Sequence, residues 1–185
     1  MMEEYAYVID YSLMGRVEDL KREPLVYLIG EDSFVLLEAV LKKGIEVEIG
    51  ERIYVGKFLE KREKIDRIKR KISYDDLPQS AKAELKEVIK KIVKNKESLY
   101  LKFLNECAPI NIRLHSLELL PGIGKKHMNI ILEEREKKKF ESFKDFEERV
   151  RISDIAGMIS ERIIKEMEGG ERYYLFIRPQ RSRKE

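Results

Sequence analysis

A short glycine-containing segment before a basic run holds the most specific chemistry in this sequence. Gly122 and Gly124 permit a tight turn, and Ile123 between them can anchor that turn in a core. The helix expected after the turn would start with unpaired N–H groups and the positive end of its dipole, beside Lys125 and Lys126. Such a helix start binds phosphate, so it could hold a sugar–phosphate backbone without reading bases.

This segment resembles the helix-hairpin-helix family of nucleic-acid-binding motifs over residues 117–135. The candidate phosphate contacts are residues 122–126, and His127 in the first turn of the second helix could also approach phosphate. Arg113, just before the motif, could bind too, or it could serve as a cap or form an internal ion pair. The family usually has a small residue where Met128 stands, and a bulkier side chain there could open the helix crossing. The matching residues are Leu120, Pro121, Gly122, Ile123, Gly124, Ile131 and Leu132.

Hairpins of this family often occur in pairs, and residues 151–157 resemble a second, degenerate copy. Asp154 and Ala156 stand where glycines are expected. Because an acidic side chain would repel phosphate, we interpret this copy as structural, and the sequence leaves open whether it binds.

A second basic stretch covers Lys57–Ile72, with 8 basic and 3 acidic groups. Its side chains could line a groove for single-stranded nucleic acid. The alternative is a solvated charged edge that blocks strand pairing. A tyrosine stripe earlier in the chain could stack on bases, although core packing is its more frequent role. The stripe comprises Tyr5, Tyr7, Tyr11, Tyr27 and Tyr54. The candidate binding residues in this stretch are Lys61, Arg62, Arg67, Lys69 and Arg70.

The distribution of charge supports a polyanion partner more than its total does. The 38 Lys and Arg against 35 Asp and Glu leave a net charge of only +3. Residues 1–51 carry −7, residues 52–102 carry +8 and residues 103–185 carry +2. This asymmetry predicts a surface for a polyanion, or two parts of the chain that attract each other.

The first 74 residues read as short strands. Residues 3–11, 24–30, 33–41, 45–49, 52–58 and 65–74 show apolar alternation or β-rich composition. Two hairpins are expected, with turns at residues 30–33 and at Gly50-Glu51. So many short strands predict a small barrel of the oligonucleotide/oligosaccharide-binding (OB) kind, closed or partly closed.

Helical periodicity dominates the rest of the chain. We expect a helical connector over residues 75–110, then a helix-hairpin-helix domain over residues 111–170 with helices at 114–120, 125–138, 142–150 and 153–167. Residues 172–178 alternate like a strand, which we expect to return to the barrel, and residues 179–185 form a basic tail. The predicted class is α+β.

The wider arrangement resembles the archaeal family called domain of unknown function 655. The resemblance rests on the barrel, the helical connector, Asn111-Ile112-Arg113-Leu114-His115 leading into Leu-Leu-Pro-Gly-Ile-Gly-Lys-Lys, and the closing Tyr-Tyr-Leu-Phe-Ile. It implies an intracellular archaeal protein with a nucleic-acid-binding role, and it supplies no established activity.

Other chemistries find little support. Cys107 is the single cysteine, which excludes an intramolecular disulfide and a Cys-rich zinc site and favours a reducing, cytoplasmic location. An inert thiol is a better interpretation of Cys107 than a nucleophile paired with His115. No apolar run approaches the about 20 residues of a membrane span. We therefore expect no catalytic residues, metal, cofactor or membrane partner, and leave open a monovalent cation at the hairpin.

These patterns favour a non-enzymatic nucleic-acid-binding protein that makes sequence-nonspecific backbone contacts. RNA is preferred over DNA only through the family resemblance and the barrel type. The first alternative is a protein-interaction adaptor in a translation, transcription or repair complex, in which the hairpins are a packing scaffold. A nucleic-acid-processing enzyme is the third hypothesis.

Overall fold

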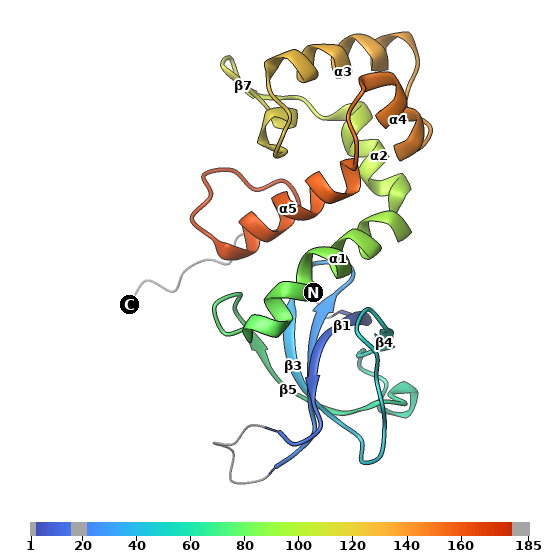
Figure 1. Cartoon of the computed structure of the whole chain (residues 1–185), viewed down its shortest axis with the longest axis vertical. Coiled ribbons are helices and arrows are strands. Elements are labelled where there is room, and N and C mark those ends of the chain that lie inside the picture. The colour runs from blue at the N-terminus through green and yellow to red at the C-terminus, as the bar shows by residue number, and fades with distance from the viewer. Residues whose placement is uncertain (1–2, 16–21, 179–185) are drawn as a thin grey trace. The chain divides into compact units, whose positions relative to one another are not determined.

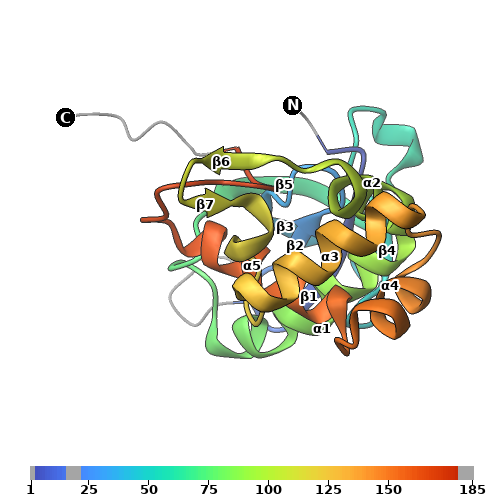
Figure 2. The ribbon, with the colours of Figure 1, turned by 90° about the horizontal axis from the view of Figure 1, so that it is seen from above.

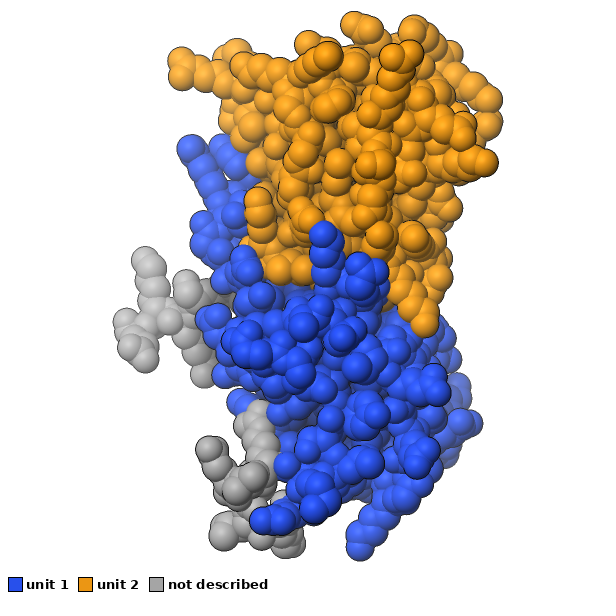
Figure 3. All heavy atoms as spheres, viewed as in Figure 1, with its two compact units in different colours: residues 1–88, 167–185 blue, residues 89–166 orange. Residues whose placement is uncertain are grey.

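The computed structural model describes residues 3–15 and 22–178 and has the predicted α+β architecture (Figure 1). Its described part contains a five-stranded antiparallel sheet and five α-helices. The chain divides into two compact units, which Figure 3 colours separately. Unit 1 comprises residues 1–88 and 167–185, and unit 2 comprises residues 89–166. The predicted basic tail, 179–185, lies outside the described residues.

The sheet of unit 1 has the strand order β4-β1-β2-β3-β5. Its apolar core is contributed mostly by one face, with Ala6, Val8, Val26 and Leu28 fully buried and Ile65 closing the cluster. The opposite face is also buried along much of β1 to β3, which explains why these strands are apolar throughout. The strands are β1 (Tyr5–Ser12), β2 (Leu25–Gly30), β3 (Leu36–Leu41), β4 (Arg52–Tyr54) and β5 (Ile65–Ile72).

The sheet is open, and the predicted hairpin around Gly50 is wrong. Residues 45–49 form a loop instead of a strand, and β4 pairs with β1 through Tyr5 and Tyr54. Gly44 and Gly50 both have left-handed backbones, with φ of +74° and +78°, so the chain turns at each end of this loop. Within the described residues β4 and β5 do not pair, and no closed barrel forms.

The tyrosine stripe contributes mainly to packing. Tyr7 and Tyr27 are buried, with 3% and 4% of their surface exposed. The rings of Tyr5 and Tyr54 meet edge to face with centroids 5.3 Å apart, and the Arg52 guanidinium lies 3.5 Å from the Tyr5 centroid. These contacts use the ring surfaces that stacked bases would need.

The helices follow the sheet in the chain. Helix α1 begins in unit 1, where Ser80 donates a 2.6 Å hydrogen bond to Asp10 of β1, and it ends in unit 2. The remaining elements of unit 2 are mostly short, and Figure 2 shows them from a second direction. The helices are α1 (Gln79–Asn95), α2 (Glu97–Glu106), α3 (Lys125–Lys137), α4 (Phe143–Val150) and α5 (Ile155–Glu168).

The helix predicted over residues 114–120 is wrong. This stretch contains strand β7 (Leu114–His115), which pairs with β6 (Pro109–Asn111), and the 3-10 helix η2 (Ser116–Leu119). Its leucines recur every three residues, and Leu117 and Leu120 are buried. A period of three fits the 3.0 residues per turn of a 3-10 helix as well as it fits one α-helical face.

The strand predicted over residues 172–178 is also wrong, and no strand returns to the sheet there. Gly169 and Gly170 both have left-handed backbones and end α5. Residues 173–177 are all half-buried, so the alternating sequence does not correspond to alternating burial. This segment nevertheless belongs to unit 1. Among the described residues, no helix has the length and apolar character needed to span a membrane.

Helix α5 contains a buried ion pair that gives a test of the fold. Arg162 Nε donates to Glu166 Oε1 at 2.9 Å, and the side chains are 3% and 0% exposed. Glu166→Ala removes a buried carboxylate that bonds the Arg162 guanidinium, so it should lower the free energy of unfolding by about 3–5 kcal/mol. The apolar double variant Arg162→Met/Glu166→Leu should recover most of this loss. Urea unfolding measures both, and equal losses in the two variants would contradict the expectation.

Candidate nucleic-acid interface

The turn before α3 is held by one buried side chain between two exposed glycines. Ile123 is 4% exposed, and its N–H donates a 3.1 Å hydrogen bond to the carbonyl of Leu120. Gly122 has φ of +85°, and a Cβ added there would lie 3.2 Å from Met158 Cε. A Cβ added to Gly124 would meet nothing within 4 Å. The conformation thus requires glycine at position 122, whereas position 124 leaves open space beside the helix start.

The start of α3 has no side-chain cap. Gly124 is the N-cap residue, and the first helical hydrogen bond, from the N–H of Met128 to its carbonyl, is 2.9 Å long. Lys125 and Lys126 are exposed, and His127 is half-buried. The first N–H groups of this helix therefore have no side-chain cap and lie beside two exposed lysines.

The second hairpin is closed by the chain's own carboxylates. Asp154 Oδ1 accepts a 3.1 Å hydrogen bond from the N–H of Gly157, and Glu147 Oε1 accepts a 2.9 Å bond from the N–H of Ile155. Lys90 contacts Asp154 Oδ2 at 2.8 Å. Burial opposes ionisation of Asp154, but the bonds from Lys90 and Gly157 outweigh it and lower the pKa of the carboxyl. The start of α5 is therefore already occupied by negative charge.

The second segment has left-handed backbones at Arg151 and Asp154, with φ of +59° and +60°, whereas Ala156 lies inside α5. Asp154 thus has the left-handed backbone that Gly122 has in the first turn. Non-glycine residues in this conformation are strained, which indicates that the surrounding contacts hold the turn in place.

His115 fixes the segment that leads into the turn. Its Nδ1 accepts a 3.1 Å hydrogen bond from the N–H of Leu117, and its own N–H donates to Glu118 Oε1 at 2.8 Å. Together these bonds form a capping box at the start of η2. Burial, and then the nearby Arg135, lower the pKa of His115, while Glu118 has the opposite effect. His115 thus has a structural role as a neutral imidazole.

Cys107 likewise lies in a structural setting. Arg135 donates to the carbonyl oxygens of Cys107 and Leu104, at 3.0 and 3.3 Å, and so satisfies the end of α2. Burial raises the pKa of the Cys107 thiol despite the neighbouring guanidinium. Since Nδ1 of His115 is already bonded, these contacts give no support to a nucleophile–base pair.

Most predicted binding residues of the basic stretch have partners within unit 1. Lys69 and Arg70 contact the buried carboxylate of Glu38, at 3.3 and 3.1 Å. Arg67 pairs with Glu23 and Asp66, and Arg62 donates to the carbonyl oxygens of Val55 and Gly56. These contacts favour the interpretation of β5 as a charged edge strand.

The sequence predicted Lys61 as a binding residue but missed the small surface that it forms with Lys57 and Phe58 at the start of this stretch. Phe58 is 42% exposed, and the ammonium groups of Lys57 and Lys61 each lie 5.0 Å from the centroid of its ring. Lys61 belongs to the 3-10 helix η1 (Leu59–Lys61) between β4 and β5. The adjacent cation and aromatic ring of Lys57-Phe58 are the sequence signal that could have identified this surface.

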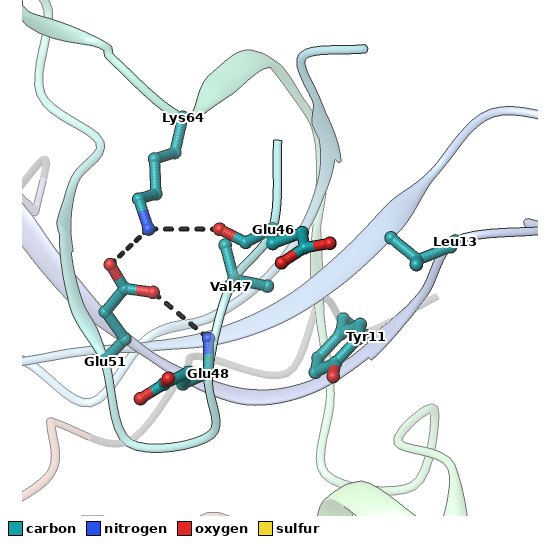
Figure 4. Close-up of a pocket in the computed structure, with 7 residues that line it drawn as sticks. All are labelled: Tyr11, Leu13, Glu46, Val47, Glu48, Glu51 and Lys64. Carbon is teal, nitrogen blue, oxygen red and sulfur yellow. Dashed lines mark hydrogen bonds and ion pairs between the residues drawn. The ribbon is translucent and has the colours of Figure 1, made fainter. Parts of the chain in front are cut away.

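Unit 1 also has a surface hollow whose charged lining is mainly acidic (Figure 4). Lys64 reaches into it but is bound by Glu51 at 2.5 Å and by the carbonyl of Glu46 at 3.1 Å. Burial tends to raise the pKa of Glu51, and the bond from Lys64 reverses the shift and lowers it. The hollow suits a cation better than a polyanion. Its lining residues are Tyr11, Leu13, Glu46, Val47, Glu48, Glu51 and Lys64.

The structure therefore separates the predicted site residues into two groups. Arg113 and residues 122–127 belong to unit 2, and the residues at 61–70 belong to unit 1. Residues 122–127 lie together at the start of α3, with Gly122, Gly124, Lys125 and Lys126 exposed around the buried Ile123. Among residues 3–15 and 22–178, no cluster of His, Cys, Asp or Glu could hold a metal ion.

Comparison with known proteins identifies the family. The model of a family described as "Protein of unknown function (DUF655)" matches residues 2–178. The chain belongs to the DUF655 family. It is 48% identical to Uncharacterized protein MJ0038 from Methanocaldococcus jannaschii, over 95% of this chain and 80% of that protein. It is also similar to the crystal structure of Af1531 from Archaeoglobus fulgidus, a DUF655 protein, with 43% identity and a TM-score of 0.87 over 94% and 99% of the two chains.

The two glycines of the turn predict different responses to substitution. Gly122→Ala should lower the free energy of unfolding by about 1–2 kcal/mol, because alanine disfavours the left-handed backbone and its Cβ crowds Met158. Gly124→Ala provides the matched control and should change stability by no more than about 0.5 kcal/mol. Thermal or urea unfolding measures both, and the reverse order of effects would refute this description of the turn.

The setting of His115 predicts a pH dependence. Because its pKa is lowered from the ordinary 6.5, the folded chain binds fewer protons than the unfolded chain below that pH. The free energy of unfolding should therefore fall as the pH drops below about 6.5 and level off below the folded-state pKa. An NMR titration of the two imidazoles, assigned with the variant His127→Gln, measures the pKa of His115. A midpoint at 6.5 or higher would contradict the assigned capping role.

Proposed function

We propose that this DUF655 protein is a non-enzymatic RNA-binding protein that holds the sugar–phosphate backbone at the start of α3. The observation that carries the proposal is the contrast between the two hairpins. The start of α3 is uncapped and lies beside Lys125 and Lys126, whereas Asp154 caps the start of α5. An anion can approach the first without displacing a protein group.

The contacts at α3 would be independent of base sequence. Backbone N–H groups and lysine ammonium groups can bind phosphate oxygens but do not distinguish bases. We interpret η2, the turn and α3 as a helix-hairpin-helix motif with a shortened first helix, which leaves His127 and Arg113 as flanking contacts. This arrangement suits a duplex or a structured RNA.

The sheet adds a second, weaker element to the proposal. Its strand order, with β4 and β5 at the two edges, is compatible with an open barrel of the OB kind. In that interpretation the connection from β4 to β5 contacts a neighbouring single strand through Phe58, Lys57 and Lys61. We prefer RNA over DNA because of the OB type proposed for this sheet. The single, half-buried cysteine suits a cytoplasmic location.

A charge-reversal pair tests the proposal. Lys125→Glu/Lys126→Glu should weaken RNA binding at least about tenfold and make the slope of log affinity against log salt shallower by about 1–2. Lys139→Glu/Lys144→Glu makes the same change of charge at side chains that are 74% and 85% exposed elsewhere in unit 2. Its affinity should change less than about threefold. Fluorescence anisotropy at several salt concentrations measures both, and equal losses would refute a specific role for the start of α3.

The alternative is a protein-interaction adaptor, favoured by the acidic hollow of Figure 4. Here the hollow, with Glu46 and Glu48 at its exposed rim, would take a basic side chain of a partner. This function predicts no measurable affinity for RNA or DNA. The same titrations separate the two functions. Repeating them in K⁺ and in Na⁺ would reveal a monovalent cation at the hairpin, and we propose no other cofactor.

A further inference from the structure

The β6–β7 hairpin exposes an isoleucine that folding does not use. Ile112 stands at its tip with a relative exposure of 105%, beside the exposed Arg113 and Asn111. Each of the other large hydrophobic residues that are exposed in the described chain retains part of its burial, up to Met14 at 71%. A side chain so exposed adds little to core stability, which leaves the Ile112 side chain available to a binding partner.

Hydrogen bonds within and below the turn fix the conformation of the hairpin tip. The N–H of Arg113 donates to Asn111 Oδ1 at 2.9 Å, which fixes the turn itself. Below it, Ser116 Oγ donates to the carbonyl of Ala108 at 2.7 Å, and this bond ties the base of β7 to the chain before β6. Arg135 holds Cys107 one residue earlier. Ile112 is therefore presented by a preorganised support, which lowers the entropic cost of using it.

The hairpin and the start of α3 belong to one continuous structure. Helix η2 contacts both β7 and α3, and the His115 capping box fixes its first turn. Figures 1 and 2 both show the β6–β7 hairpin on the side of unit 2 where α3 begins. A nucleic acid held at Lys125 and Lys126 could therefore extend toward the tip.

The chemistry of the tip suits a nucleic acid better than a protein. Protein-binding surfaces need a contiguous apolar patch, and here Asn111 and Arg113 flank a single apolar residue. Apolar wedges, isoleucine among them, open the stack between two bases in some protein–nucleic acid complexes, and a neighbouring arginine can contact the adjacent phosphate.

We propose that Ile112 is a wedge that recognises the junction between duplex and single-stranded RNA, with Arg113 contacting the phosphate beside the opened step. This inference rests on the proposed function, because α3 must hold the duplex for the wedge to reach its end. The substrate class is then a forked or overhanging duplex. A continuous duplex offers the wedge only stacked steps, which cost more to open.

The test compares a forked RNA duplex with a fully paired, blunt-ended duplex of the same stem sequence, here called the closed duplex. The wild-type protein should bind the fork about tenfold more tightly and increase the fluorescence of 2-aminopurine placed at the junction. Ile112→Ser should lose both the preference and the fluorescence change, while its affinity for the closed duplex and its melting temperature stay unchanged. Ile112→Phe should retain the preference. Leu99→Ser, at a 59% exposed position of α2, is the matched control and should behave as wild type.

The variants of the two proposals fail differently. Lys125→Glu/Lys126→Glu should weaken binding to both RNAs, whereas Ile112→Ser acts only on the fork. Equal wild-type affinity for the two RNAs, or a preference that survives in Ile112→Ser, would overturn the wedge and leave the phosphate site standing. Absence of binding to either RNA would overturn both.

Discussion

The burial of Ile123 determines the direction in which α3 starts. Removing this side chain from water contributes about 1.5–3 kcal/mol, which exceeds the cost of placing glycine in the left-handed turn beside it. Once Ile123 is buried, its neighbours Gly122 and Gly124 remain exposed, and the N–H groups that follow face outward. The candidate phosphate site at the start of α3 depends on this anchor.

In unit 2, charged side chains form hydrogen bonds with backbone groups at the ends of several helices. Arg135 satisfies carbonyl groups at the end of α2, and Arg149 does the same for Glu134 and Lys138 at the end of α3. Glu97 accepts from the N–H of Phe143 at the start of α4. Many of the charges in this highly charged chain therefore act on its own backbone, and net charge alone is a poor guide to its partners.

Local patterns predicted the elements that local forces determine. The apolar runs of β1 to β3 and the Ser142 cap of α4 could be located closely from sequence. The candidate phosphate site could be proposed from the sequence because its residues are consecutive. Residues 45–49 and 172–178 alternate like strands, but no neighbouring strand pairs with them, and pairing depends on distant parts of the chain.

Long-range partners account for the rest of what sequence could not show. Glu38 binds Lys69 and Arg70, and Glu23 binds Arg67, across separations of more than 30 residues. A basic run therefore appeared free when most of it was already paired. The exposure of Ile112 had no local signal either, because isoleucine usually indicates burial.

The cap on α5 has a consequence for competition between anions. Asp154 is joined by only a few bonds to the helix start that it occupies, so its effective concentration there is about millimolar or higher. A free anion at micromolar concentration cannot displace it. Under the proposed function, the starts of α3 and α5 would therefore respond to phosphate over different concentration ranges.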